Sequence, residues 1–359
     1  MTSGHVLAVD AGNTKSVVLV ADREGTVVGR AVTGPGDIYG ADREETATST
    51  VLAAVDAALG DAGVPASDVV AATCCLAGVD WPEDRALWSG LLASRLPSAR
   101  LEVLNDGFAL LWCLNPGGVG VAVTVGTGPA IAARGADGST AAMGFWCQDA
   151  LGGVGLADLA LRAVYLAEQG LGPATALRSA LLEWSGFGDV ESLLHSFTRR
   201  GSSGSWCRAA SAAPVVLACA AEGDPVSVAL VADQARLLVD YADATARRAG
   251  LDLGGGQRGD DRVGRDAGEG GPLKHPDDAE GEGWPLALGG GVVASGLPVF
   301  REALLAEIGT RLPGAVPVVV EVEPVVGSLV GALGLVDPAL AEAAFGRLTA
   351  ASALLGERR

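Results

Sequence analysis

An internal repeat in the order of strands and turns limits the folds open to this chain. In each copy we expect a strand, a Gly/Thr turn, a second strand, an Asp/Gly turn and a third strand. The segments are residues 5–9, 10–15, 16–20, 22–25 and 26–32 in the first copy and 119–125, 126–129, 130–134, 135–138 and 139–143 in the second. The copies share this layout without sequence identity, and repetition of this kind indicates a chain built from two similar units.

Helices and further strands follow each copy. After the first copy we expect a helix at 44–59, a strand at 69–75, a helix at 87–96 and a strand at 101–104. After the second we expect helices at 156–169, 174–184, 209–221 and 225–249, a strand at 286–288, a helix at 297–311, a strand at 316–322, and helices at 325–335 and 338–353. Strands that alternate with helices, one of them wholly apolar, predict an α/β fold with buried parallel strands.

The charge of the chain excludes several classes of partner. Among 359 residues, 25 Lys and Arg stand against 43 Asp and Glu, so the formal net charge is 25 − 43 = −18. Nucleic-acid binding needs clustered Lys and Arg to neutralise phosphates, and anionic membrane surfaces attract basic segments. We therefore expect neither nucleic acid nor a membrane as a partner.

One segment differs in composition from the rest. In residues 254–283 Gly, Asp, Glu and Arg dominate, and bulky apolar side chains nearly vanish. Such a segment cannot bury enough apolar surface to offset the entropy of ordering. We expect a disordered insertion at the surface.

The N-terminal segment and the cysteines indicate a cytoplasmic protein. Asp10 and Lys15 interrupt the apolar start that a signal peptide would need, and no run reaches the roughly 18–20 apolar residues of a spanning helix. The six cysteines form no CxxC pair and have no His at zinc spacing. This pattern is typical of free thiols in a reducing compartment.

Three glycine-bearing turns each follow an apolar strand. Without a Cβ in the way, their backbone N–H groups can approach a phosphate closely. The turns contain Gly12, Asn13, Thr14 and Lys15; Gly126, Thr127 and Gly128; and Gly289, Gly290 and Gly291. The first adds a hydroxyl and a cation, and Asp10 beside it could hold Mg²⁺ through water. Singly, such turns are mostly structural; together they predict a nucleotide site. Neither a Walker-type phosphate loop nor a dinucleotide-binding fingerprint is present.

Asp106 is the candidate catalytic residue. It follows the predicted strand at 101–104, and ligands bind at the carboxyl ends of strands in open α/β sheets. A carboxylate there could accept the proton of a hydroxyl that attacks the γ-phosphate of ATP. The structural alternative, an Asp that only forms a turn before Gly107, carries equal weight on this motif alone.

Five motifs, taken in order, resemble the BadF/BadG/BcrA/BcrD-type ATPase family and, within it, the N-acetylglucosamine kinases. The motifs are residues 10–15, 76–80, 104–107, 125–128 and 288–292. The resemblance implies an α/β chain of two ribonuclease-H-like domains of the actin/hexokinase type, with a nucleotide cleft between them. It implies domains at 1–115, joined by the C-terminal helix at about 338–355, and at 116–337, with a helical insert at about 156–250.

The resemblance also assigns roles to residues. It implies ATP and Mg²⁺ as cofactors, phosphate motifs at 10–15 and 126–128, an adenosine motif at 289–291, and Asp106 as the base. The chain departs from the kinases at Pro129 and Ala130, where they carry Ser-Asn, and near 144–153, where their acidic pair is lost unless Asp149 replaces it. We expect a more apolar acceptor pocket, to which we assign Asp37, Asp80, Asn105, Trp146 and Asp149.

The function expected from these observations is an ATP-dependent small-molecule kinase. It would transfer the γ-phosphate to a hydroxyl of an amino sugar or a sugar-like metabolite, which is its small-molecule partner. A homodimer is an assembly that the resemblance allows. Two alternatives remain open: an ATP-hydrolysing sensor or activator without a sugar acceptor, and a relative without catalysis.

Overall fold

The computed structural model describes residues 4–40, 44–200, 211–255 and 283–355, and it contains the same sheet twice. The first sheet comprises β1 (His5–Ala11), β2 (Ser16–Asp22), β3 (Val27–Thr33), β4 (Val69–Leu76) and β5 (Arg100–Asn105). The second comprises β6 (Gly120–Val125), β7 (Pro129–Arg134), β8 (Thr140–Ala142), β9 (Trp284–Gly289) and β10 (Ala315–Val319).

Both sheets have the same strand order. The first runs β3-β2-β1-β4-β5 and the second β8-β7-β6-β9-β10, so each reads 3-2-1-4-5 when its own strands are counted. In each sheet the first three strands are antiparallel and the last two join in parallel. The repeat and the α/β class expected from the sequence are therefore confirmed.

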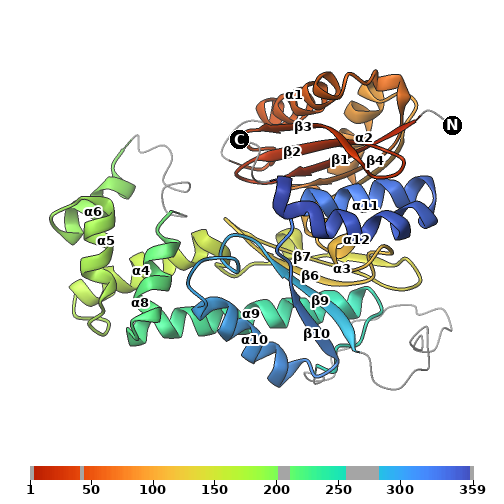
Figure 1. The fold of residues 1–359 in the computed structure, drawn as a ribbon. Helices are drawn as coiled ribbons and strands as arrows, with labels where there is room; N and C mark the ends of the chain where they lie inside the picture. The colour runs from red at the N-terminus through yellow and green to blue at the C-terminus, as the bar shows by residue number, and fades with distance from the viewer. Residues whose placement is uncertain (1–3, 41–43, 201–210, 256–282, 356–359) are drawn as a thin grey trace.

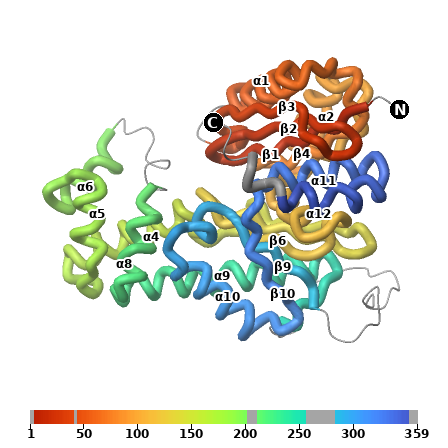
Figure 2. The backbone as a smooth tube through the Cα atoms, in the orientation of Figure 1, coloured from red at the N-terminus to blue at the C-terminus, as the bar shows by residue number. Residues whose placement is uncertain are grey.

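The two sheets lie in a stack of layers, which Figures 1 and 2 show from the side. Helices α1 (Glu44–Ala62) and α2 (Pro82–Arg95) cover the outer face of the first sheet. Between the sheets lie α3 (Leu111–Leu114), α11 (Pro324–Val336) and α12 (Pro338–Leu355). Helices α9 (Pro225–Arg248) and α10 (Val299–Arg311) cover the far face of the second sheet.

Strand β1 shows why these layers form. Val6 and Ala8 point into the core between the sheets, whereas Leu7 and Val9 point into the core under α1 and α2. All four side chains are fully buried, because a strand covered on both faces has no solvent side. The continuous apolar sequence at the start of the chain is thus explained by the position of β1 in the middle of its sheet.

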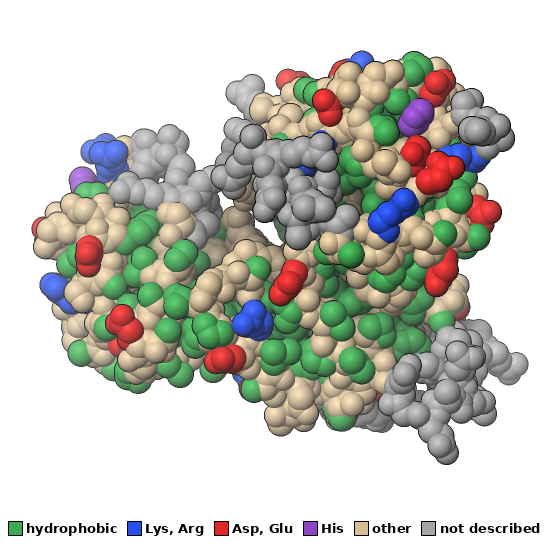
Figure 3. Space-filling view, viewed as in Figure 1, with side chains coloured by type: hydrophobic (Ala, Val, Ile, Leu, Met, Phe, Trp, Pro, Cys, Tyr) green, Lys and Arg blue, Asp and Glu red, His purple; other side chains and the backbone are tan. Residues whose placement is uncertain are grey.

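A helical extension projects beside the second sheet. It comprises α4 (Gly152–Glu168), α5 (Leu177–Ser185), α6 (Val190–Thr198) and α8 (Ala213–Ala221). In the space-filling view the surface is indented between this extension and the part built on the first sheet (Figure 3). The described Lys and Arg side chains on that face are scattered and do not gather into one basic patch.

Several predicted boundaries differ from the structure. Helix α2 begins at Pro82, earlier than expected, because Pro occupies its first turn and the Asp84 carboxylate accepts the Trp81 backbone N–H at 2.8 Å. Strand β10 ends at Val319, short of the expected range, and α6 was not among the expected helices. The expected insertion at 254–283 lies almost wholly outside the described residues. The domain boundaries at 115 and 337 stay predictions.

Two expectations from the sequence concern membrane-spanning helices and the state of the cysteines. No single helix there has the length and apolar composition to cross a membrane; the pair α8 and α9, bent by 114°, meets that test when taken together. The described thiols are unpaired: Cys74, Cys75, Cys113, Cys147 and Cys219. Cys207 lies outside the described residues.

Candidate active site

A cleft of about 460 Å³ lies where strands of both sheets end. The carboxyl ends of β1, β4, β5 and β6 and the turn after β9 all reach it, as expected for ligand sites in such sheets. Most of the predicted site residues line it: Asp10, Gly12, Asn13, Thr14, Lys15, Asp37, Asp80, Asn105, Asp106, Gly126, Thr127, Gly128 and Gly290. The fold thus brings together residues from both halves of the chain.

The two phosphate turns face each other across the cleft. The Oγ1 atoms of Thr14 and Thr127 are 3.3 Å apart. A Cβ on Gly12 would come no closer than 3.9 Å to another atom, and one on Gly128 would meet nothing within 4 Å. Among the described residues, the backbone N–H groups of Asn13, Thr14, Thr127 and Gly128 have no partner. The turns therefore offer two hydroxyls and several free N–H donors to one phosphate chain.

The second phosphate turn rests on the beginning of α4. The backbone N–H groups of Gly153 and Val154 donate to the carbonyls of Gly126 at 2.9 Å and Thr127 at 3.0 Å. Gly152 has a φ of +76°, and a Cβ there would lie 2.8 Å from the Gly128 backbone. The sequence motifs did not predict this support, although Gly152 and Gly153 stand together at the end of the segment 144–153, where the chain departs from the kinases.

The third glycine turn contributes less than expected. Only Gly290 of its three glycines lines the cleft; its φ is +89°, and a Cβ there would lie 2.5 Å from the Val125 carbonyl oxygen. Gly289 packs against Leu110, whose Cδ1 would be 2.7 Å from an added Cβ. Gly291 has open space around it. The adenosine role of this turn stays a prediction.

Carboxylates gather on the floor of the cleft. Burial, followed by repulsion from Asp10, Asp37 and Asp80, raises the pKa of Asp106 to about 8. Burial raises the pKa of Asp10 to about 7, although Lys15 opposes the shift. Asp37 also has a raised pKa because of burial. The cleft therefore lacks the positive charge that would keep all these carboxylates ionised at neutral pH.

This arrangement fits a divalent cation. Among the described residues the Asp10 carboxylate accepts no hydrogen bond, and Lys15 is the cation that partly offsets its charge. No group of three or more His, Cys, Asp or Glu side chains in the described chain is placed to hold a metal. Mg²⁺ suits such a site, because it is held by one or two carboxylates and takes its other ligands from phosphates and water. Asp10 would hold it from the floor of the cleft.

Lys15 is engaged in an ion pair. Its Nζ lies 3.2 Å from Glu323 Oε1 at the start of α11, and Arg30 contacts the other Glu323 oxygen, also at 3.2 Å. The Lys15 side chain is 53% exposed, and exposed ion pairs contribute little stability. A phosphate in the cleft can therefore compete with Glu323 for this cation.

The part of the cleft where the sequence predicts the acceptor is built around Asp80. Asn105 Nδ2 donates to Asp80 Oδ1 at 2.9 Å, and a Cβ on Gly144 would lie 2.1 Å from the same oxygen. Burial, then Asp84 and Asp37, raises the pKa of Asp80 to about 6, while the bond from Asn105 lowers it. Asp80 and Asn105 thus form one polar pair near the candidate base.

The other two predicted acceptor residues lie outside this cleft. Trp146 lines a neighbouring cavity of about 180 Å³, which shares Asp80, Asn105, Gly144 and Phe145 with the cleft. Asp149 lines neither space, and its carboxylate accepts a hydrogen bond from the Tyr241 hydroxyl at 2.7 Å. The structure thus brings Asp37, Asp80 and Asn105 to the cleft but not Trp146 or Asp149.

The raised pKa values predict how stability changes with pH. An unfolded Asp titrates near pH 4, so between pH 5 and 8 the folded chain holds more protons on Asp10, Asp80 and Asp106 than the unfolded chain does. The free energy of unfolding should therefore fall by several kcal/mol as pH rises through this window, because each unit of pKa difference is worth about 1.4 kcal/mol.

Chemical denaturation at pH 5, 6, 7 and 8 without divalent cations measures this slope. Asp106→Asn should remove the fall in stability above pH 7, because Asp106 has the highest pKa of the three carboxyl groups. Stability that stays level or rises from pH 6 to 8 would show that the cleft carboxylates ionise as freely as in water.

The chain is similar to several known proteins. The profile of the BadF/BadG/BcrA/BcrD ATPase family matches residues 7–259. The N-acetyl-D-glucosamine kinase of Dictyostelium discoideum is 26% identical over 264 residues, covering 70% of this chain and 82% of that protein. A solved structure of a proposed N-acetylglucosamine kinase from Chromobacterium violaceum is 25% identical, with a TM-score of 0.62, and covers 91% of this chain and 98% of that chain.

A second solved structure resembles the same fold. It is a proposed N-acetylglucosamine kinase from Porphyromonas gingivalis, 20% identical, with a TM-score of 0.59, covering 91% of this chain and 97% of that chain. At this identity the likeness concerns the fold alone. Together with the repeated sheets, these similarities confirm the two-domain fold of the actin/hexokinase type.

Proposed function

The chain belongs to the BadF/BadG/BcrA/BcrD ATPase family, and from this premise we propose that it is an ATP-dependent sugar kinase. Its acceptor is an amino sugar or a related sugar, as the names of the similar proteins suggest. One observation carries the proposal. Two Thr-bearing phosphate turns from the two halves meet in the cleft that also contains Asp106.

The residues of the cleft divide the reaction between them. Thr14, Thr127 and the free N–H groups of their turns hold the phosphates of ATP. The acceptor hydroxyl lies at Asp106, and Asp80 with Asn105 orients the sugar. As the hydroxyl oxygen bonds to the γ-phosphorus, the bond from that phosphorus to the ADP oxygen breaks, and Asp106 takes the hydroxyl proton. Mg²⁺ held by Asp10 would neutralise charge on the phosphates.

A phosphotransfer screen tests the proposal. Purified protein is incubated with Mg-ATP and each member of a panel of amino sugars and neutral sugars, and the products are read by mass. At least one acceptor should gain a phosphate, with ADP formed in equal amount. ADP formation that no sugar accelerates, with no phosphorylated product, would contradict the kinase and favour the ATP-hydrolysing sensor.

A further inference from the structure

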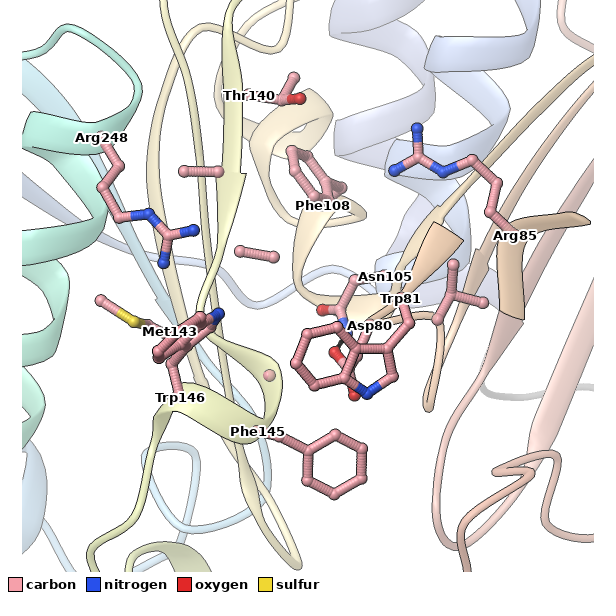
Figure 4. A pocket seen from close by; sticks show the side chains of 14 residues that line it. Asp80, Trp81, Arg85, Asn105, Phe108, Thr140, Met143, Phe145, Trp146 and Arg248 are labelled. Carbon is pink, nitrogen blue, oxygen red and sulfur yellow. Dashed lines mark hydrogen bonds between the residues drawn. The ribbon is translucent and has the colours of Figure 1, made fainter. Parts of the chain in front are cut away.

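A second cavity opens from the acceptor side of the cleft. Its volume is about 180 Å³, and Asp80, Asn105, Gly144 and Phe145 form the wall that both spaces share. Beyond that wall it is lined by Trp81, Arg85, Phe108, Thr140, Met143, Trp146 and Arg248, among others (Figure 4). A saccharide whose reacting ring lies at Asp106 would therefore have room for a second unit beyond Asp80.

Exposed aromatic side chains gather at this place. Within the described chain, the aromatic side chains with the largest exposure are Tyr39 at 50%, Trp81 at 38%, Phe145 at 44% and Trp146 at 62%. Tyr39 meets Phe145 edge to face at 4.9 Å, and Trp81 stacks on Phe145 at 6.4 Å between ring centroids. All four lie on the cleft or the second cavity. Exposed apolar surface concentrated in one place marks a binding site.

Two arginines enter the second cavity from opposite sides. Arg85 comes from α2 and Arg248 from the end of α9; Trp146 lies beside Arg248, and Trp81 lies toward the middle of the view (Figure 4). Neither guanidinium has an acidic partner among the described residues, whereas Arg95 on α2 pairs with Asp56. In a chain of net charge −18, these two guanidinium groups place positive charge on the wall of one cavity.

The charges of the lining indicate what the cavity binds. Asp80 is its one carboxylate and lies at the shared wall, so an anion would avoid that end. Arg248 lies over the Trp146 ring, 5.8 Å from its centroid, which leaves the guanidinium edge open to a carboxylate or phosphate. Flat faces of the aromatic rings suit the apolar face of a sugar ring or another flat group.

We propose that the acceptor is longer than one sugar ring and carries an anionic group. The reacting sugar lies at Asp80 and Asn105, and a second unit enters the cavity between Trp81 and Trp146. A carboxylate or phosphate on this second unit pairs with Arg85 and Arg248. The inference rests on the proposed sugar kinase function and names the acceptor class for it.

Four acceptors with the same reacting amino sugar test the inference. They are the free monosaccharide, its neutral disaccharide, the disaccharide with a uronic acid as second ring, and the disaccharide with a phosphate on the second ring. The charged disaccharides should have a KM about tenfold or more below that of the neutral one, since a hydrogen bond to a charged group is worth about 1.5–3 kcal/mol. The two charged arms distinguish carboxylate from phosphate.

Matched variants assign the effect to the cavity. Arg248→Ala and Arg85→Ala should each raise the KM for the charged disaccharide about tenfold and leave the KM for the monosaccharide and for ATP unchanged. Arg247→Ala and Arg95→Ala are the controls, because these arginines of the same two helices pair with Asp243 and Asp56 and do not line the cavity. They should change none of these constants.

Failure of the inference can be told from failure of the proposed function. If the monosaccharide is phosphorylated but charge on the second ring gives no advantage, the kinase stands and the second subsite is wrong. The same holds if the advantage survives both arginine variants. If no sugar in the panel is phosphorylated, the kinase itself is wrong and the inference falls with it.

Discussion

Replacement of Asp106 by Asn should lower kcat for phosphotransfer by about 10²–10⁴-fold while ATP binding is kept. The substitution preserves the shape of the side chain and removes the group that takes the acceptor proton. ATP affinity should stay equal at neutral pH and increase above pH 8, because only the ionised carboxylate repels the phosphates. Steady-state kinetics and calorimetric titration with Mg-ATP measure the two effects separately.

The pH profile gives a second signature of the same residue. A base acts in its ionised form, and the pKa of Asp106 is about 8 in the free protein. For the wild-type protein, kcat/KM for the acceptor should therefore rise with pH up to about 8, and the Asn variant should lack this rise.

Asp137→Asn is the matched control for Asp106→Asn. Asp137 also precedes a glycine in a turn, but it is exposed, bonds to Ser139 and lies outside the cleft. Its replacement should leave kcat unchanged. Phosphotransfer by Asp106→Asn within tenfold of the wild-type rate would show that Asp106 is only a turn residue.

The architecture was predictable because it repeats. Strand–turn–strand patterns are local, and the second copy at β6–β8 could be recognised from the first at β1–β3. The boundaries of α2 were harder, because its start depends on a bond between the Asp84 side chain and the Trp81 backbone. Periodicity of apolar residues carries no information about such a cap.

The candidate site was only partly predictable. Glycine turns after strands and Asp106 could be found because their chemistry depends on short, contiguous motifs. The contact of Phe145 with Tyr39 and Trp81 joins residues far apart in the chain, and no spacing rule predicts it. Asp149 was assigned by its place in a motif, yet the structure pairs it with Tyr241.

The support of the phosphate turn by α4 leads to a second large effect. Gly152→Ala should raise the KM for ATP about 10–10²-fold, because displacing a phosphate-binding turn by even about 1 Å disrupts alignment. The added Cβ would lie 2.8 Å from the Gly128 Cα and 2.9 Å from the Thr127 carbonyl oxygen, both backbone atoms of that turn. Overpacking of this kind lowers the free energy of unfolding by about 1–3 kcal/mol, and a non-glycine residue in a left-handed backbone conformation lowers it by roughly 1–2 kcal/mol more.

Gly186→Ala separates these two causes. Gly186 ends α5 with a φ of +75°, nearly that of Gly152, but a Cβ there would meet nothing within 4 Å. Both variants therefore carry the same backbone strain, and only Gly152→Ala pushes on the phosphate turn. Thermal unfolding should show a larger loss for Gly152→Ala, and only that variant should bind ATP more weakly. Equal losses of stability with unchanged ATP kinetics would mean that the turn keeps its shape without α4.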